Sequence, residues 1–423
     1  MKINLLLPLI LFISGPPALR NPNDNFDSSL GNIDTWLILK ILVYCLILIF
    51  FLYPNKLINF NQRDIKISDT KSNILFFLIF ISLLISAVKG ENTTYSIFYT
   101  FLYSSSFILF YFFSNVFVND KNFLINTIII IRNVLILIII LTLIFYLLKP
   151  EFVGVTEIEN SIRITGGKFS DFKFIPLVTY IISVILFLDN TDKNLNKFNF
   201  ICVLISLSAL FFSLTRSIIF LSIVITFVYT SYILISKTKD LFNLKKKIII
   251  FYSIFLLFIF LPKNFFLDIL SRSNTVGIFD LSGRNFIWSF SLNYMKETFF
   301  GYGIGSGFKD IFKNLPDVVY YDLDKILLTK NIGNTHNFYI EMLFAGGWVS
   351  FLSIIFLHII FILRSLMLLK KKPTRENFIL FFIFISISFV GFFDSFFIVP
   401  ASNSYAIYWI VCAMIFANIK KYE

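Results

Sequence analysis

Long apolar stretches, separated by short polar segments, recur along almost the whole chain of 423 residues. An apolar stretch of roughly 17–25 residues is long enough to cross the hydrocarbon core of a bilayer as a helix. About twelve stretches approach or meet this length, so the pattern predicts an all-α, polytopic membrane protein. The predicted spans lie near 3–15, 35–53, 73–88, 96–118, 123–148, 172–188, 199–213, 217–235, 248–262, 337–363, 378–398 and 404–418.

One predicted loop differs from the others in length and polarity. Residues 263–336 separate the ninth and tenth predicted helices, and long connections are uncommon in compact proteins unless they serve a function. We therefore expect three regions. Helices 1–9 occupy residues 1–262, a large extracytoplasmic loop occupies 263–336, and helices 10–12 with a short cytoplasmic tail occupy 337–423.

The composition supports the membrane class. Apolar residues make up 57% of the chain and charged residues only 15%, against about 45–50% and about 25% in soluble domains. These values exclude a soluble globular enzyme, a disordered chain and a disulfide scaffold. The three cysteines lie inside apolar stretches, which is not the pattern of a disulfide framework or a metal site. Two histidines also leave no room for a histidine-rich centre, so we expect neither a metal nor another cofactor.

The net charge of +12 has two interpretations. A strongly basic chain can bind nucleic acid, but in a membrane protein Lys and Arg collect in cytoplasmic loops and set the orientation. The segments 54–72, 236–247 and 364–377 and the C-terminal tail are rich in Lys and Arg, and alternation of the helices puts all four on one side. That side is therefore the cytoplasm, nucleic acid is not an expected partner, and 263–336 faces outward. Whether the first apolar segment spans or is cleaved stays open.

Two arginines occupy positions suited to binding an anion. Arg216 stands where the seventh and eighth predicted helices meet with almost no loop, and an arginine there faces a cavity, a partner or the lipid headgroups. Arg284 begins a predicted amphipathic helix that carries Trp288 and is expected to lie on the membrane surface. A guanidinium binds a phosphate through two parallel hydrogen bonds. The alternative for both arginines is an ordinary contact with solvent or headgroups.

The segment around His336 is the most informative for catalysis. His336 lies where the large loop is expected to re-enter the membrane, close to Asn337 and Glu341. A neutral imidazole can act as a general base near neutral pH, although a lone histidine is more often structural. Glu341 is expected about one and a half turns into a membrane helix, where a carboxylate needs a partner. His358, near the cytoplasmic end of the same predicted helix, is interpreted as structural.

Two further charged residues and a glycine-rich run belong to the outer face. Arg163 and Asp394 are expected near the outer ends of helices, either as site residues or as ordinary rim residues. The run 301–307 has glycine at every second position, which allows a tight turn or a close approach of backbone. The two arginines and the histidine described above map to this face as well. Cationic groups together with one base at a membrane surface suit a lipid substrate that carries phosphate.

The order and spacing of these motifs resemble the superfamily of O-antigen ligases and O-antigen polymerases, over roughly residues 160–400. The motifs that carry the resemblance are Ser213-Leu-Thr-Arg216, Gly283-Arg284 followed by Trp288, Gly301-x-Gly303-x-Gly305, His336-Asn337, and Gly346-Gly347. The match departs from the family pattern in two places. The Asn that often follows the Phe after Arg163 is absent, and so is the Pro usually found before Gly-x-Gly.

The resemblance implies an inverting membrane glycosyltransferase that uses neither a metal nor a nucleotide sugar. Such a protein moves a glycan from undecaprenyl diphosphate to an acceptor sugar at the periplasmic face of the bacterial inner membrane. By the family's motifs, Arg216 and Arg284 would bind the diphosphate and His336 would activate the acceptor hydroxyl. The remaining candidates for substrate binding are Arg163, Trp288, Asn337, Glu341 and Asp394.

Members of the superfamily differ in the acceptor, which can be a new lipid-linked repeat unit, lipid A-core, or a protein Ser or Thr. We favour a polymerase of O-antigen or capsule-type polysaccharide, in lipopolysaccharide or related biosynthesis, because the motif pattern and composition resemble such polymerases more than ligases. An O-antigen ligase is the alternative. A lipid-linked glycan flippase is less favoured, because the polar residues gather at one face and not at bilayer depth. The expected partners are the lipid-linked glycan and the bilayer, and a chain-length regulator is left open.

Overall fold

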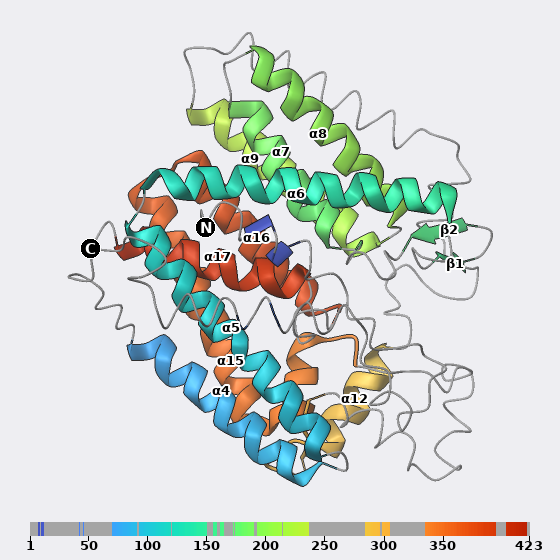
Figure 1. Cartoon of the computed structure of the whole chain (residues 1–423), viewed down its shortest axis with the longest axis vertical. Helices are drawn as coiled ribbons and strands as arrows, with labels where there is room; N and C mark the ends of the chain where they lie inside the picture. Colours follow the sequence, from blue (N-terminus) through green and yellow to red (C-terminus); the bar gives the residue numbers. More distant parts are fainter. Residues whose placement is uncertain are drawn as a thin grey trace. The chain divides into compact units, whose positions relative to one another are not determined.

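The computed structural model describes residues 7–8, 10–11, 42, 45, 70–90, 93–119, 121–149, 155–158, 161–164, 172, 174–189, 193–213, 215–236, 284–296, 298–304, 335–394 and 403–420. Within these ranges the chain is almost entirely helical (Figure 1). The helices are α4 (Thr70–Lys89), α5 (Thr93–Asn119), α6 (Lys121–Leu148), α7 (Ile175–Asp189), α8 (Lys193–Phe212), α9 (Arg216–Ser236), α12 (Arg284–Tyr294), α15 (Phe338–Lys371), α16 (Arg375–Gly391) and α17 (Asn403–Lys420).

Six of these helices, namely α4, α5, α6, α8, α9 and α15, are long and apolar enough to cross a membrane. Large apolar side chains lie exposed on them, such as Phe77, Phe227 and Phe356, where a lipid environment would cover them. The chain is therefore a polytopic membrane protein. The predicted spans near 3–15, 35–53 and 248–262 lie outside the described residues apart from isolated positions, so the total of about twelve spans stays a prediction.

A short β-hairpin occupies part of the loop predicted between the fifth and sixth spans. Strand β1 (Val155–Ile158) pairs antiparallel with β2 (Ser161–Ile164), and β2 contacts α8. Ile162 and Ile164 alternate with polar residues along β2, and Ile164 is buried, which is the period-two pattern of a strand with one covered face. The all-α prediction missed this hairpin because four-residue strands give a weak local signal.

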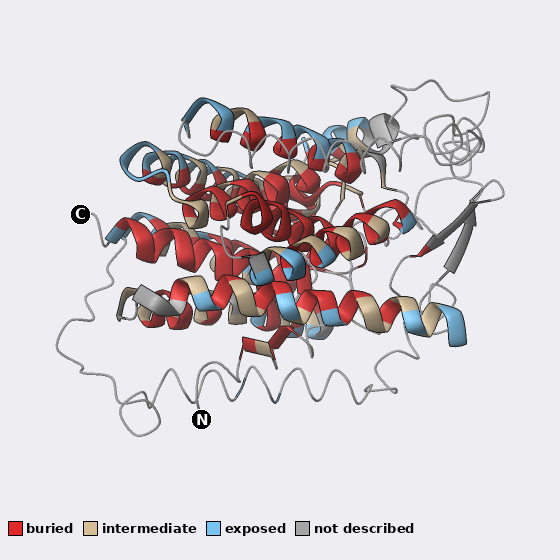
Figure 2. Cartoon of the chain, turned by 90° about the horizontal axis from the view of Figure 1, so that it is seen from above, coloured by how far each residue is buried: buried red, intermediate tan, exposed pale blue. Residues whose placement is uncertain are grey.

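The chain divides into two compact units, which we describe separately. The first contains Met1–Leu124, Leu281–Lys371 and Ile387–Glu423, and the second contains Ile125–Asp280 and Lys372–Ser386. In the first unit α15 packs along α4, and α17 packs along α5. Helix α17 is buried from Asn403 to Ile419. Figure 2 shows some helices buried throughout and others with buried residues along one face and exposed residues along the other.

Helix α15 is broken at Gly347, whose backbone has a φ of 75° and a ψ of −169°. In an unbroken helix Tyr339 and His358 would lie roughly 28 Å apart along the axis, at about 1.5 Å per residue. Their side chains instead meet, with 2.8 Å between Tyr339 Oη and His358 Nδ1. The segment before the break therefore folds back along the segment after it. The span predicted near 337–363 is thus divided by a break, and residues 348–371 alone are long enough to cross a bilayer.

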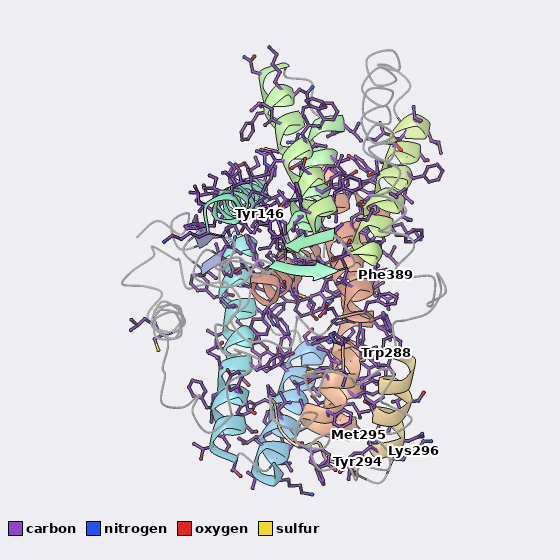
Figure 3. All side chains as sticks on the ribbon, turned by 90° about the vertical axis from the view of Figure 1, so that its right-hand side faces the viewer. Tyr146, Trp288, Tyr294, Met295, Lys296 and Phe389 are labelled. Carbon is purple, nitrogen blue, oxygen red and sulfur yellow. The ribbon has the colours of Figure 1, made fainter. Side chains whose placement is uncertain are left out.

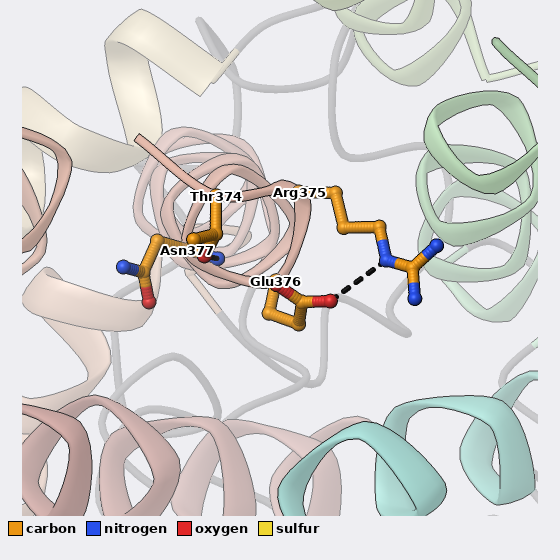
Figure 4. A network of polar contacts seen from close by, with 4 residues as sticks. All are labelled: Thr374, Arg375, Glu376 and Asn377. Carbon is orange, nitrogen blue, oxygen red and sulfur yellow. Dashed lines mark hydrogen bonds and ion pairs between the residues drawn. The ribbon is translucent and has the colours of Figure 1, made fainter. Parts of the chain in front are cut away.

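Two arginines illustrate how charge is accommodated within the second unit. Arg132, in the middle of α6, is 4% exposed and donates to the side chains of Asn133 and Asn199. Its guanidinium also lies 5.0 Å from the ring centroid of Phe198. Arg375 begins α16, and its Nε donates to Glu376 Oε1 at 2.7 Å (Figure 4). The charge in the middle of α6 is thus satisfied by neutral amides and an aromatic ring.

Candidate functional site

The residues before α15 form a tight turn, residues 335–337, which we call the His336 turn. Asn337 caps the helix, because its Oδ1 accepts the backbone N–H of Tyr339 at 2.9 Å and of Ile340 at 3.1 Å. Its Nδ2 donates to the Phe392 carbonyl at 3.2 Å, in the turn that follows α16. Asn337 therefore ties the start of α15 to the end of α16 and is committed to backbone groups on both sides.

His336 itself has an unusual backbone conformation. Its φ is 50°, and it is the only residue other than glycine with a positive φ among those that the structure describes. The left-handed region costs an L-residue roughly 1–2 kcal/mol, and such residues persist where the surroundings over-determine them, often at functional sites. The side chain is partly exposed, whereas both neighbours, Thr335 and Asn337, are buried. The histidine is thus partly exposed between two buried residues.

Thr335 is held through all of its polar groups. Its N–H donates to Glu341 Oε2 at 2.9 Å, and its carbonyl accepts the indole N–H of Trp288 at 3.0 Å. Its hydroxyl donates to the Asn337 carbonyl at 2.8 Å. Glu341 thus has the partner that a carboxylate in a membrane helix needs. Trp288 and Glu341, both expected among the substrate-binding residues, here contact the residue that precedes His336.

The predicted amphipathic helix is present as α12, and it packs against α15. In Figure 3 this segment runs beside α15, and four of its residues are labelled, namely Trp288, Tyr294, Met295 and Lys296. The Met295 carbonyl accepts the indole N–H of Trp348 at 3.1 Å, which fixes the end of α12 next to the break in α15. Arg284 is the first residue of α12, four positions before Trp288. The segment is therefore bonded to the His336 turn through Trp288, near the middle of α12, and to Trp348 of α15 through Met295, just past the end of α12.

Residues 299–303 dock on the break in α15, and we call them the docked segment. The carbonyls of Phe344 and Ala345 accept the N–H groups of Tyr302 at 2.7 Å and Gly303 at 3.0 Å, while the Trp348 N–H donates to the Phe299 carbonyl at 3.2 Å. A Cβ atom at Gly301 would lie 2.4 Å from the Phe344 carbonyl oxygen. The glycines serve this close approach of two backbones, and Gly305 and Gly307 lie outside the described residues.

The other predicted site residues lie on α9, on β2 and just after α16. In the second unit α8 ends at Phe212 and α9 begins at Arg216. Arg216 therefore stands at a short junction between two helices, as predicted. Arg163 lies on β2 opposite Thr156. In the first unit Asp394 is partly exposed, and its N–H donates to the Val390 carbonyl at 2.9 Å. Asp394 lies two residues after Phe392, whose backbone carbonyl accepts a hydrogen bond from the side-chain amide of Asn337.

Several contributors to the site were not predicted from the sequence. The Thr335 backbone, the Phe392 carbonyl and Trp348 all act through contacts between distant segments, so no local pattern identifies them. Asn337 was detectable, because an Asn directly before a helix is a strong capping signal. His358 is buried against Tyr339 and Ser388, in keeping with a structural role. Among the described residues no group of three or more His, Cys, Asp or Glu side chains lies together.

The comparison with known families covers most of the segments described above. The family model for O-antigen ligase matches residues 201–355. The matched range contains Arg216, α12, the docked segment, the His336 turn and the break at Gly347, but not Arg163 or Asp394. No match to a curated protein was found. Residues 201–355 therefore form an O-antigen ligase domain of the kind that O-antigen ligases and O-antigen polymerases share, in a membrane enzyme of the glycosyltransferase type.

Proposed function

We propose that the protein polymerises undecaprenyl-diphosphate-linked oligosaccharide repeat units into O-antigen or capsule-type polysaccharide. The reaction would take place at the outer face of the bacterial inner membrane, with release of undecaprenyl diphosphate. One observation carries the proposal: within a matched O-antigen ligase domain, His336 has a positive φ and is partly exposed between two buried, hydrogen-bonded residues. A side chain fixed in this way suits a base that must meet an acceptor in one geometry.

The proposed chemistry assigns a proton transfer to His336. A neutral imidazole nitrogen removes the proton of an acceptor hydroxyl, and that oxygen attacks the anomeric carbon of the donor sugar from the face opposite the diphosphate. The bond from the anomeric carbon to the diphosphate oxygen breaks, so the configuration inverts. The leaving diphosphate gains negative charge, which arginine side chains are suited to stabilise. Each turnover joins the growing glycan to a new unit without a metal or a nucleotide sugar.

The fold-back of α15 bears on where this chemistry would occur. His358 lies 11 residues beyond the break at Gly347, which is roughly 16 Å along a helix. Tyr339, three residues after His336, contacts His358. The chain just after the His336 turn therefore lies alongside the segment that follows the break, so the turn is recessed among the helices of the first unit.

The polymerase and the ligase are separated by what accumulates when the protein is lost. In a deletion strain, loss of a polymerase leaves lipid A-core capped with a single repeat unit, whereas loss of a ligase leaves bare core with polymer still on its lipid carrier. We expect the single-repeat product on a gel of surface glycan, and the ladder of chain lengths should return when the gene is restored. Bare core together with lipid-linked polymer would establish the ligase instead. Unpolymerised lipid-linked units retained at the cytoplasmic face would indicate a flippase.

Arg216 and Arg284 are proposed to bind the diphosphate. Replacing either one by Ala is expected to slow chain extension by about 10²–10³-fold, the usual loss on removing one group that stabilises developing charge. Lys should restore only part of the rate, since it lacks the planar pair of donors. The measurement is extension of lipid-linked repeat units in isolated membranes, normalised to the amount of protein. Arg375→Ala is the matched control, because its guanidinium is already engaged by Glu376. Wild-type rates in both alanine variants would remove the arginines from the mechanism.

A further inference from the structure

The peptide units on either side of His336 are fixed by two kinds of contact. On the following side, Asn337 is bonded within α15 and to Phe392. On the preceding side, Thr335 is held by a carboxylate and by an indole. The carboxylate of Glu341 comes from α15 itself, and the indole of Trp288 comes from α12. These two side chains meet the backbone N–H and the backbone carbonyl of the same residue.

We infer that Glu341 and Trp288 are positioning residues that hold the imidazole of His336 in its working orientation, and that they do not bind the substrate. The inference rests on the proposed role of His336 as the base. The Thr335 carbonyl belongs to the peptide group that joins Thr335 to His336, so the indole restrains the rotation that sets the φ of His336. The Glu341 carboxylate restrains the same residue from its other side. Both contacts therefore help to keep a non-glycine residue at a φ of 50°.

The two contacts place different chemical demands on the side chains. At position 341 the Thr335 N–H needs an oxygen acceptor, which a glutamine amide also offers, so the negative charge is not essential. At position 288 the Thr335 carbonyl needs an N–H donor, which phenylalanine lacks. Trp288 has a second consequence, because α12 begins with Arg284 one turn earlier. Its hydrogen bond therefore links the helix that carries Arg284, proposed to bind the diphosphate, to the turn that carries His336, the proposed base.

Neutral and truncated variants of Glu341 test this inference. We expect Glu341→Gln to extend glycan within about fivefold of the wild-type rate, and Glu341→Ala and Trp288→Phe to lose about 10- to 100-fold, the range for a hydrogen bond that involves a charged or buried group. The loss should fall on kcat, with KM for the lipid-linked acceptor little changed, because the substrate contacts remain. The assay is extension by purified protein in liposomes with lipid-linked repeat units. Glu376→Ala removes a carboxylate from the first turn of α16 and is the matched control.

A second measurement uses His336 itself. In a His336→Asn background, adding Glu341→Ala or Trp288→Phe should lower the residual rate no further, because both residues act through the imidazole. An equal loss in Glu341→Gln and Glu341→Ala would show that the charge itself is needed and would overturn the positioning role. A rise in KM without a fall in kcat would do the same. Failure of the proposed function is distinct, since the wild-type protein itself would then extend no lipid-linked repeat units. Full activity in His336→Asn would remove the base on which the inference rests.

Discussion

Replacing His336 by Asn is expected to abolish chain extension while leaving the protein in the membrane. Asparagine adopts the left-handed region more readily than most residues, so the turn with a φ of 50° should survive the change. The imidazole, however, is lost, and removal of a general base lowers rates by about 10²–10⁴-fold. The measurement is a gel of surface glycan in the complemented deletion strain, together with the extension rate in isolated membranes.

The comparison of His336→Asn with His336→Ala separates the base from the backbone. Alanine removes the imidazole and also places a residue with no preference for positive φ in the turn, so this variant should lose stability as well as activity. His358→Asn is the matched control, since the chain has only two histidines. It disturbs the buried contact with Tyr339, and we expect a lower thermal stability but a normal ladder. A normal ladder from His336→Asn would disprove the assignment of the base.

The helices were predictable because membrane spans are a local property of the sequence. Twenty consecutive apolar residues specify a spanning helix almost regardless of their neighbours. The abrupt junction of α8 and α9 at Arg216 was visible for the same reason. The start of α12 was equally local, since Gly283 and Arg284 precede a run with helical periodicity.

The arrangement around His336 was not predictable in this way. The glycines at 301 and 303 and those at 346 and 347 were each noticeable in the sequence, but their mutual contact joins segments about 45 residues apart. The break in α15 leaves carbonyls without helical partners, and only the docked segment supplies the N–H groups that satisfy them. A hydropathy pattern records neither fact, because apolar side chains occupy α15 on both sides of the break. The pattern predicts a span there, and only the tertiary hydrogen bonds show where the helix is broken.

Among the glycines that the structure describes in the first unit, Gly347 is expected to lose the most stability when it is replaced by Ala. The φ of 75° and ψ of −169° lie in a region that essentially only glycine adopts, which costs alanine roughly 1–3 kcal/mol. A Cβ atom there would also lie 2.4 Å from the Phe299 carbonyl oxygen, so the docked segment would have to move. Its three backbone hydrogen bonds to α15 contribute about 0.5–1.5 kcal/mol each. We therefore expect a destabilisation of about 2–5 kcal/mol, measured as a lower midpoint of thermal unfolding in detergent.

Gly391→Ala provides the matched control, because the nearest atoms to a Cβ at that position lie 3.6 Å away and its backbone is helical. That variant should unfold at the wild-type midpoint. Gly347→Ala should also lose chain extension in whatever fraction remains folded. Residues 338–346 include the N–H groups of Tyr339 and Ile340, which bind Asn337 and so fix the His336 turn. If the break were incidental, the alanine would straighten α15 at little cost, and both variants would share the wild-type midpoint and ladder. A selective loss at 347 would instead show that the proposed base is held in place by the fold-back of its own helix.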